Sequence, residues 1–143
     1  MRANEFKWAS EGGDVDTVYR GLADDIDVND QWDGLPPLLA AVKSNQIGVV
    51  RILLATDDVD IEATDNYRGG KNSALHYACS EGNTECIGLL GQDRRMTKEI
   101  LNAVNEQGKT ALMLAVELGH LSSVKEMAKL DWTGSRPMRM AKA

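Results

Sequence analysis

The sequence has few of the residues that build an aromatic core or a covalent framework. Its 143 residues include one phenylalanine, three tryptophans, three tyrosines, three prolines and two cysteines. Two cysteines do not make a disulfide framework, so a reduced, intracellular setting is the simplest interpretation. Few aromatics beside many alanines, glycines and leucines favour thin helical layers over a β-sandwich. At this length we expect a single domain.

Long hydrophobic runs and a dense basic surface are also missing. The N-terminal residues lack the apolar core of a signal peptide, and the longest apolar run, residues 35–42, is short and carries two prolines. The formal net charge is −6 with both signs interspersed, whereas phosphate binding needs a concentrated basic face. We therefore expect no membrane and no nucleic acid as partner, and a cytoplasmic location.

The most informative stretch begins at Ser73 and reads Ser-Ala-Leu-His-Tyr-Ala-Cys-Ser-Glu-Gly-Asn. Ser73 is a good helix N-cap, because its hydroxyl can accept a hydrogen bond from the first turn. Leu75, Ala78 and Cys79 form one apolar helix face, and Gly82 ends the helix. Such a helix has only about two turns and is too short to be stable alone. Neighbouring segments must therefore hold it.

The same frame occurs three times. Leu38, Leu75 and Leu112 are each 37 residues from the next, within Pro-Pro-Leu-Leu, Ser-Ala-Leu-His and Thr-Ala-Leu-Met. The stretch from Ser73 resembles the start of an ankyrin repeat: Thr-Pro-Leu-His, one variable residue, Ala-Ala, two variable residues, then Gly-His or Gly-Asn. The family period is about 33 residues. We expect the additional residues in a long turn at 65–72 and a charged insert at 91–99, both as loops.

The resemblance implies an all-α ankyrin-repeat solenoid of stacked helix-turn-helix pairs with β-turn fingers along one edge. The expected repeats of the single domain, residues 1–143, are 4–28, 29–63, 64–102, 103–131 and a partial fifth at 132–143. The fifth rests on Gly134, Pro137, Met138 and Ala141, which match a repeat start. A degenerate C-terminal cap and a longer protein trimmed at this point explain the match equally well.

Specific helices and turns are expected within the repeats. The second repeat should hold helices at 38–44 and 47–54, with Asn45 in the left-handed turn that the family usually gives to glycine. The fourth should hold helices at 110–118 and 121–130. His76 is retained only in the third repeat and Thr110 only in the fourth. Because these residues tie adjacent turns in the family, the resemblance implies softer coupling between the second and third repeats.

His76, Cys79 and Cys86 are the residues that could carry chemistry. Imidazole and thiolate suit zinc, but the sequence offers no fourth ligand at a suitable spacing. In the ankyrin frame both cysteines fall at small buried positions and His76 becomes a satisfied interior histidine. Gly-x-Ser-x-Gly, His-Glu-x-x-His and a complete phosphate-binding loop are missing from the sequence. We predict a non-catalytic protein without cofactor or metal.

The resemblance implies a protein–protein interaction module that binds another protein or a peptide in a concave groove. Fingers and first helices line this groove, and we expect the protein to be monomeric. Trp, Tyr and Arg are enriched at binding hot spots, although Trp32 could equally pack over a neighbouring finger. The candidate groove residues are Gln31, Trp32, Leu35, Lys43, Ser44, Tyr67, Arg68, Ser80, Glu81, Glu106, Gln107, Lys109, Glu117 and Leu118.

Two other settings remain open for such a module. The chain could be one segment of a larger ankyrin-containing protein, such as a ligase adaptor, channel or kinase. It could also be a small free-standing regulator or inhibitor. The locally basic insert at 92–99 and the tail with Arg136, Arg139 and Lys142 are expected to be solvated, given the acidic total.

Overall fold

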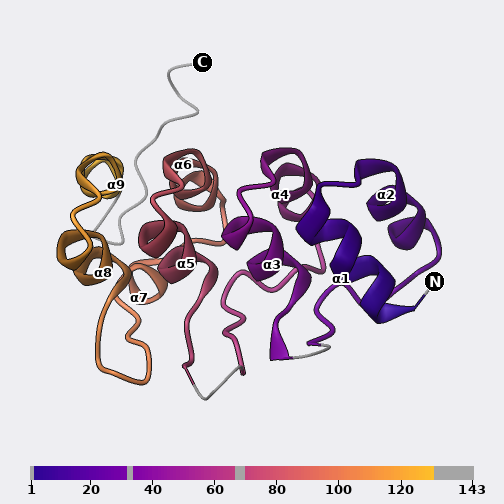
Figure 1. Ribbon diagram of the computed structural model, residues 1–143, viewed down its shortest axis with the longest axis horizontal. Helices are drawn as coiled ribbons and strands as arrows, with labels where there is room; N and C mark the ends of the chain where they lie inside the picture. Colours follow the sequence, from indigo (N-terminus) through magenta and orange to yellow (C-terminus); the bar gives the residue numbers. More distant parts are fainter. Residues whose placement is uncertain (1, 32–33, 67–69, 131–143) are drawn as a thin grey trace.

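The computed structural model describes residues 2–31, 34–66 and 70–130, and within them the regular elements are helices (Figure 1). These are α1 (Ala3–Gly12), α2 (Val15–Ala23), α3 (Pro37–Lys43), α4 (Ile47–Leu54), α5 (Ala74–Glu81), α6 (Thr84–Gln92), α7 (Lys98–Leu101), α8 (Ala111–Glu117) and α9 (Leu121–Ala128). The predicted all-α class is confirmed. None of these helices is long and apolar enough to cross a membrane.

The helices form two parallel rows. Helices α1, α3, α5 and α8 make the first row, and α2, α4, α6 and α9 make the second row (Figure 1). Each helix packs against its partner in the pair and against the neighbouring helices of its own row. The described parts of the loops from α2 to α3, α4 to α5 and α7 to α8 extend to one side (Figure 1); we name these parts finger 1 (residues 24–31 and 34–36), finger 2 (55–66 and 70–73) and finger 3 (102–110). This is the predicted solenoid.

The repeated leucines and alanines lie at equivalent places in the first row. Leu38 and Leu75 are almost fully buried, and Leu112 packs against the core with part of its surface exposed. An alanine three residues later in each helix, such as Ala41 and Ala78, is completely buried. A side chain this small allows successive helices to approach closely, so a chain with one phenylalanine can still build a dense core.

The turn inside each helix pair uses a left-handed residue, as expected at Asn45. The φ angle of Asn45 is 55°, and the glycines at the same place in the third and fourth repeats, Gly82 and Gly119, have φ angles of 73° and 74°. Asparagine tolerates this conformation better than most residues with a side chain. The predicted helix at 47–54 coincides with α4, and the predicted start after Ser73 coincides with that of α5.

The segment at 91–99 differs from its prediction as a solvated loop. Helix α6 continues to Gln92, and α7 forms where a loop was expected. Met96, Ile100 and Leu101 are buried in the hydrophobic core of the stack. These apolar side chains explain the difference, because they draw the inserted chain back onto the core. The fifth repeat start at 134–141 lies outside the described residues.

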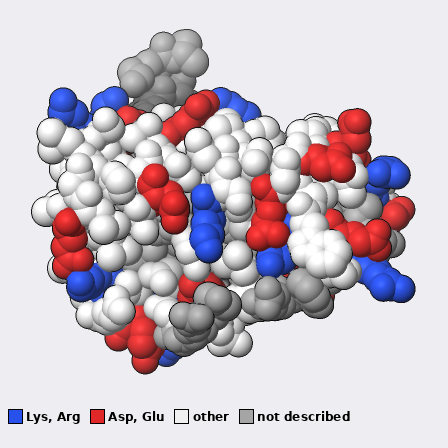
Figure 2. Space-filling model, viewed as in Figure 1, with Lys and Arg blue, Asp and Glu red and all other residues white. Residues whose placement is uncertain are grey.

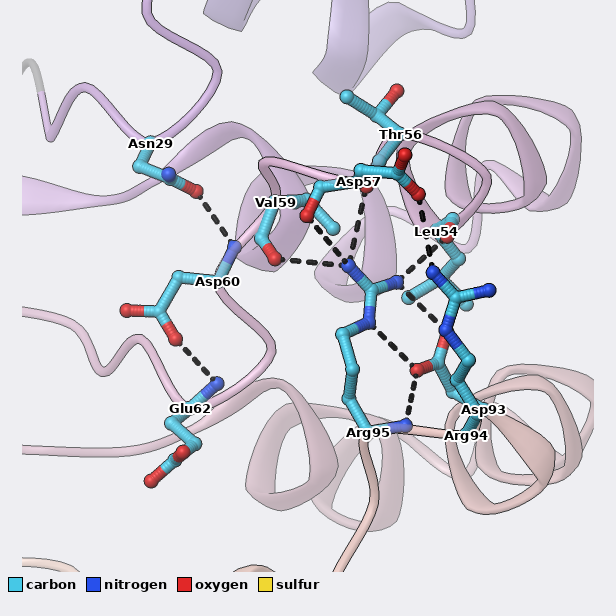
Figure 3. Close-up of polar contacts among 10 residues, drawn as sticks. All are labelled: Asn29, Leu54, Thr56, Asp57, Val59, Asp60, Glu62, Asp93, Arg94 and Arg95. Carbon is cyan, nitrogen blue, oxygen red and sulfur yellow. Dashed lines mark hydrogen bonds and ion pairs between the residues drawn. The ribbon is translucent and has the colours of Figure 1, made fainter.

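Arg95, in the same segment, joins the second and third repeats (Figure 3). Its Nη2 atom donates to the carbonyl of Leu54 at 2.7 Å, and its Nη1 atom donates to the carbonyls of Thr56 and Val59, both at 3.1 Å. The carboxylate of Asp93 accepts from Nε and Nη2 at 2.8 and 2.9 Å. The last carbonyls of a helix lack intrahelical donors and attract positive charge. The guanidinium therefore caps α4 from the neighbouring repeat.

Asp93 holds the guanidinium in place. Partial burial would raise the pKa of this carboxyl group, but the hydrogen bonds and charge of Arg95 outweigh burial and lower it. The carboxylate therefore stays ionised at neutral pH. We call the contacts of Arg95 and Asp93 the clamp. The clamp joins the second and third repeats, for which softer coupling is predicted, and it opposes such softening. The softer coupling itself remains a prediction.

Replacing Arg95 with alanine should lower the free energy of unfolding by about 2–3 kcal/mol, because the carbonyls of Leu54, Thr56 and Val59 and the carboxylate of Asp93 lose a charged donor. The adjacent Arg94 provides a matched control. Its side chain is 82% exposed and forms an ion pair with Asp57, which is 87% exposed, so Arg94→Ala should cost less than about 0.5 kcal/mol. Urea unfolding followed by circular dichroism measures both. Equal losses would show that the clamp contributes no more than a surface ion pair.

Candidate partner-binding groove

A hollow of about 160 Å³ lies where α5 and α8 meet fingers 2 and 3. Its lining combines one aliphatic and one aromatic side chain with amide, imidazole and hydroxyl groups: Asn72, His76, Tyr77, Ser80, Asn105, Gln107 and Leu114. The helices supply the apolar and aromatic walls, and the fingers supply amides that can both donate and accept hydrogen bonds. This combination suits the side chains and backbone of a peptide.

A hydrogen-bond network fixes the aromatic wall of the hollow. The hydroxyl of Tyr77 donates to the carboxylate of Asp65, which is 4% exposed at the base of finger 2. The same carboxylate accepts from the backbone N–H of Asn72 at 2.9 Å. The Asn72 side chain in turn accepts from the amide of Asn105 at 2.9 Å, across to finger 3. The tyrosine ring is therefore held in place before any ligand arrives.

Backbone hydrogen bonds join the fingers edge to edge. The N–H of Asn66 donates to the carbonyl of Gly34 at 2.7 Å, and the N–H of Glu106 donates to the carbonyl of Gly70 at 2.9 Å. The side chain of Asn105 also accepts from the N–H groups of Gln107 and Lys109, which shapes finger 3. The fingers thus form one continuous ledge beside the first row of helices.

His76 connects the third repeat to the fourth beneath this ledge. Its Nδ1 atom accepts from the N–H of Ser73 at 3.2 Å, so Nε2 carries the proton that bonds the carbonyl of Lys109 at 2.9 Å. Burial lowers the pKa of His76, although the Lys109 hydrogen bond and the charge of Asp65 oppose this. The imidazole is therefore neutral at pH 7, as expected for a satisfied interior histidine.

Charges of both signs accompany the groove. Lys43 is exposed on α3, and its Nζ atom lies 5.9 Å from the centroid of the Tyr77 ring, within cation–π range. Lys109 and Glu117 form an ion pair at 2.8 Å on the other side of the hollow. Figure 2 shows acidic and basic side chains interspersed among uncharged areas on the viewed face. The groove therefore carries no uniform charge that would select a strongly basic or acidic partner.

A family model described as "Ankyrin repeats (3 copies)" matches residues 6–97 and 59–136. The chain belongs to the ankyrin repeat family. Ankyrin repeats are protein-interaction modules, and the helix pairs and fingers described above are their structural units in this chain.

Known ankyrin proteins resemble parts of the chain. NF-kappa-B inhibitor alpha from Sus scrofa is 38% identical over 96 residues, which cover 66% of this chain and 29% of the inhibitor. The probable E3 ubiquitin-protein ligase XBOS32 from Oryza sativa subsp. japonica is 39% identical over 59 residues, or 41% of this chain and 11% of the ligase. E3 ubiquitin-protein ligase XBAT33 from Arabidopsis thaliana is 40% identical over 62 residues, which cover 41% of this chain and 11% of the ligase. The chain spans less than a third of the length of each relative.

Most of the described residues predicted for the groove are accessible. Gln31, Lys43, Ser44, Glu81, Glu106, Gln107, Glu117 and Leu118 are exposed, and Ser80 and Lys109 are half-buried. Ser80, Gln107 and Lys109 lie at or beside the hollow. Trp32, Tyr67 and Arg68 lie outside the described residues. That all these residues bind a partner remains a prediction.

The prediction for Leu35 is wrong. Its side chain is only 8% exposed and belongs to the hydrophobic core. Leu35 lies between Gly34, at the finger edge, and Pro36, at the N-cap of α3. At this place the chain turns back into the stack, and the leucine turns with it instead of facing a ligand.

Sequence analysis missed several of the residues that line the hollow. Tyr77 and Leu114 each lie three residues before a predicted groove residue, Ser80 and Glu117, and so belong to the same helix face. Extending each predicted position by one turn would have found them. Asn72 and Asn105 gave no such signal, because their role depends on how two fingers meet.

The cysteines play no part in the hollow. Cys79 and Cys86 are fully buried, and burial raises the pKa of their thiols to about 12 and about 11. A thiol that stays protonated is a poor nucleophile and metal ligand. Their interpretation as structural residues is therefore supported. Across residues 2–31, 34–66 and 70–130, no group of three or more metal-ligating side chains comes together.

Acidification should destabilise the fold through His76. Because the folded-state pKa lies below the usual value, the unfolded chain takes up a proton first as the pH falls below about 6.5. The free energy of unfolding should therefore decrease from pH 8 to pH 5.5, with a His76 contribution of at most about 1.4 kcal/mol per pH unit. His76→Leu should be less stable at pH 8 but show a shallower slope, measured by urea unfolding. Equal slopes in the wild-type and His76→Leu proteins would contradict the assignment.

Proposed function

We propose that this ankyrin domain is a non-catalytic module that holds one partner protein or peptide in the groove between its fingers and its first row of helices. The observation that carries the proposal is the hollow between α5, α8 and fingers 2 and 3. It places a tyrosine, a leucine and several amides around one space that a partner side chain could enter.

The order of this surface supports the proposal. Binding is weakened when side chains and loops must be immobilised, so a surface fixed in advance gives higher affinity for the same contacts. The Tyr77–Asp65 bond and the backbone bonds between fingers hold the wall and the ledge in place. Lys43 beside the Tyr77 ring adds a cation that can pair with a carboxylate of the partner.

The relatives suggest two settings for such a groove. NF-kappa-B inhibitor alpha is by its name an inhibitor, and resemblance to it favours a module that sequesters another protein. The ubiquitin-protein ligases match only along part of their length, which favours an ankyrin segment that recruits a protein to another activity. In both settings the domain binds as a monomer and supplies recognition rather than catalysis.

A pair of charge-matched variants tests the groove. Lys43→Glu with Leu114→Asp alters the groove by three charge units, and Arg51→Glu with Ser122→Asp makes the same change at exposed positions of the second row. Quantitative affinity capture with the wild-type domain should yield partners that the groove variant loses at least tenfold and the second-row variant retains. Circular dichroism confirms that both variants fold. Partners lost equally from both variants, or from neither, would refute groove binding.

A further inference from the structure

A second hollow, of about 110 Å³, lies between finger 2 and the segment that forms α7; we call it the α7 hollow. Helix α7 lies outside the two rows of helices (Figure 1), in the segment that differs from the solvated loop expected of an insert. Glu99 and Ile100 of this helix line the hollow. The α7 hollow therefore depends on a segment that lengthens the repeat beyond the family period of about 33 residues.

The α7 hollow and the hollow of the groove lie on opposite sides of finger 2. Successive residues of an extended chain point to opposite faces. Lys71 and Ser73 line the α7 hollow, whereas Asn72 between them lines the hollow of the groove. Thr64, which pairs with Ser73 in an antiparallel bridge, also lines the α7 hollow. The buried His76 lines both, so its side chain separates them.

One wall of the α7 hollow is apolar. Ile100, Ala103 and Val104 supply this wall, and Val104 is 55% exposed. Covering such apolar surface is favourable, because it removes the surface from water. The volume suits a single side chain, since sites for small-molecule ligands usually enclose about 300–1,000 Å³.

The charges that line the α7 hollow do not balance. Glu62 and Glu99 are both exposed, and neither forms an ion pair within the part of the chain that the structure describes. Lys71 is the cation of the lining, and its Nζ atom lies 3.6 Å from the carboxylate of Glu106 on finger 3. Its charge is therefore already paired outside the lining. The two remaining carboxylates leave an excess of negative charge beside the apolar wall.

We propose that the α7 hollow binds a lysine or arginine side chain of a partner protein. The methylene stem would cover Ile100 and Val104, and the charged end would lie at Glu62 and Glu99. Basic side chains suit such a site because their stems cover apolar surface while their charged ends stay in contact with water. A metal ion suits it less, because no three metal-ligating side chains come together in the described ranges. The proposal concerns a different surface from the groove and does not depend on it.

Titration of the whole chain with capped amino acids, followed by the amide chemical shifts in NMR spectra at constant ionic strength, tests the proposal. Nα-acetyl-lysine methylamide should cause saturable shifts at residues 62–64, 71–73 and 99–104, with a dissociation constant in the millimolar range. Nα-acetyl-norleucine methylamide has a similar stem without the ammonium group, and it should bind at least fivefold more weakly.

Two double variants with the same net charge provide the matched comparison. Glu62→Gln with Glu99→Gln removes both carboxylates of the lining and keeps the size of the side chains, so it should weaken binding of the lysine probe at least fivefold. Asp16→Asn with Glu85→Gln removes two negative charges from exposed positions of the second row and should retain the affinity. Leu114→Asp, in the groove, should also leave binding of this probe unchanged. Circular dichroism confirms that each variant folds.

Three outcomes would overturn the proposal. The first is a titration in which the lysine probe causes no saturable shifts at the α7 hollow, whether or not it causes them at the groove. The second is equal affinity for the norleucine probe, which would reduce the hollow to an apolar contact without recognition of charge. The third is equal weakening in the two double variants, which would assign binding to the net charge of the protein rather than to Glu62 and Glu99.

Discussion

Each layer of this protein depends on contact with its neighbours, because two helices of eight or nine residues cannot form a stable unit in water. Helices α5 and α6 have 8 and 9 residues, yet Ala78, Cys79, Cys86 and Ile87 within them are completely buried. Most of that burial is against adjacent pairs rather than within the pair. The hydrophobic surface between layers is therefore both the core of the protein and the source of its elongated shape.

Polar contacts at the junctions between layers differ from one junction to the next. Between fingers 1 and 2, Asn29 donates to the carbonyl of Asp58 and accepts from the N–H of Asp60, both at 2.8 Å; Figure 3 shows the second of these bonds. Arg95 joins the second and third repeats from the second row. His76 joins the third and fourth beneath the fingers. The same apolar stacking thus combines with an amide, a guanidinium and an imidazole, whose sensitivities to pH and salt differ.

The sequence contained enough information for the stack but not for these junctions. Periodic leucines, a left-handed Asn45 and the Ser73 cap are local patterns, and each predicted its element correctly. Arg95 looked like a solvated basic residue because its acceptors, the carbonyl of Leu54 at the end of α4 and those of Thr56 and Val59 in the loop that follows, are 36 to 41 residues away in the sequence. Leu35 was misjudged for a related reason. Whether a side chain at the foot of a finger faces the core or the groove is decided by the path of the backbone.

The joining of the fingers through main-chain atoms has a consequence for how recognition can diversify. Asn66 and Glu106 make their bonds to Gly34 and Gly70 with backbone groups, which every amino acid except proline can supply. The side chains of Asn66 and Glu106 can therefore be exchanged without loosening the attachment of one finger to the next. A scaffold of this kind separates the residues that maintain its architecture from those that choose its ligand, so new specificities can arise by surface substitution while the fold stays the same.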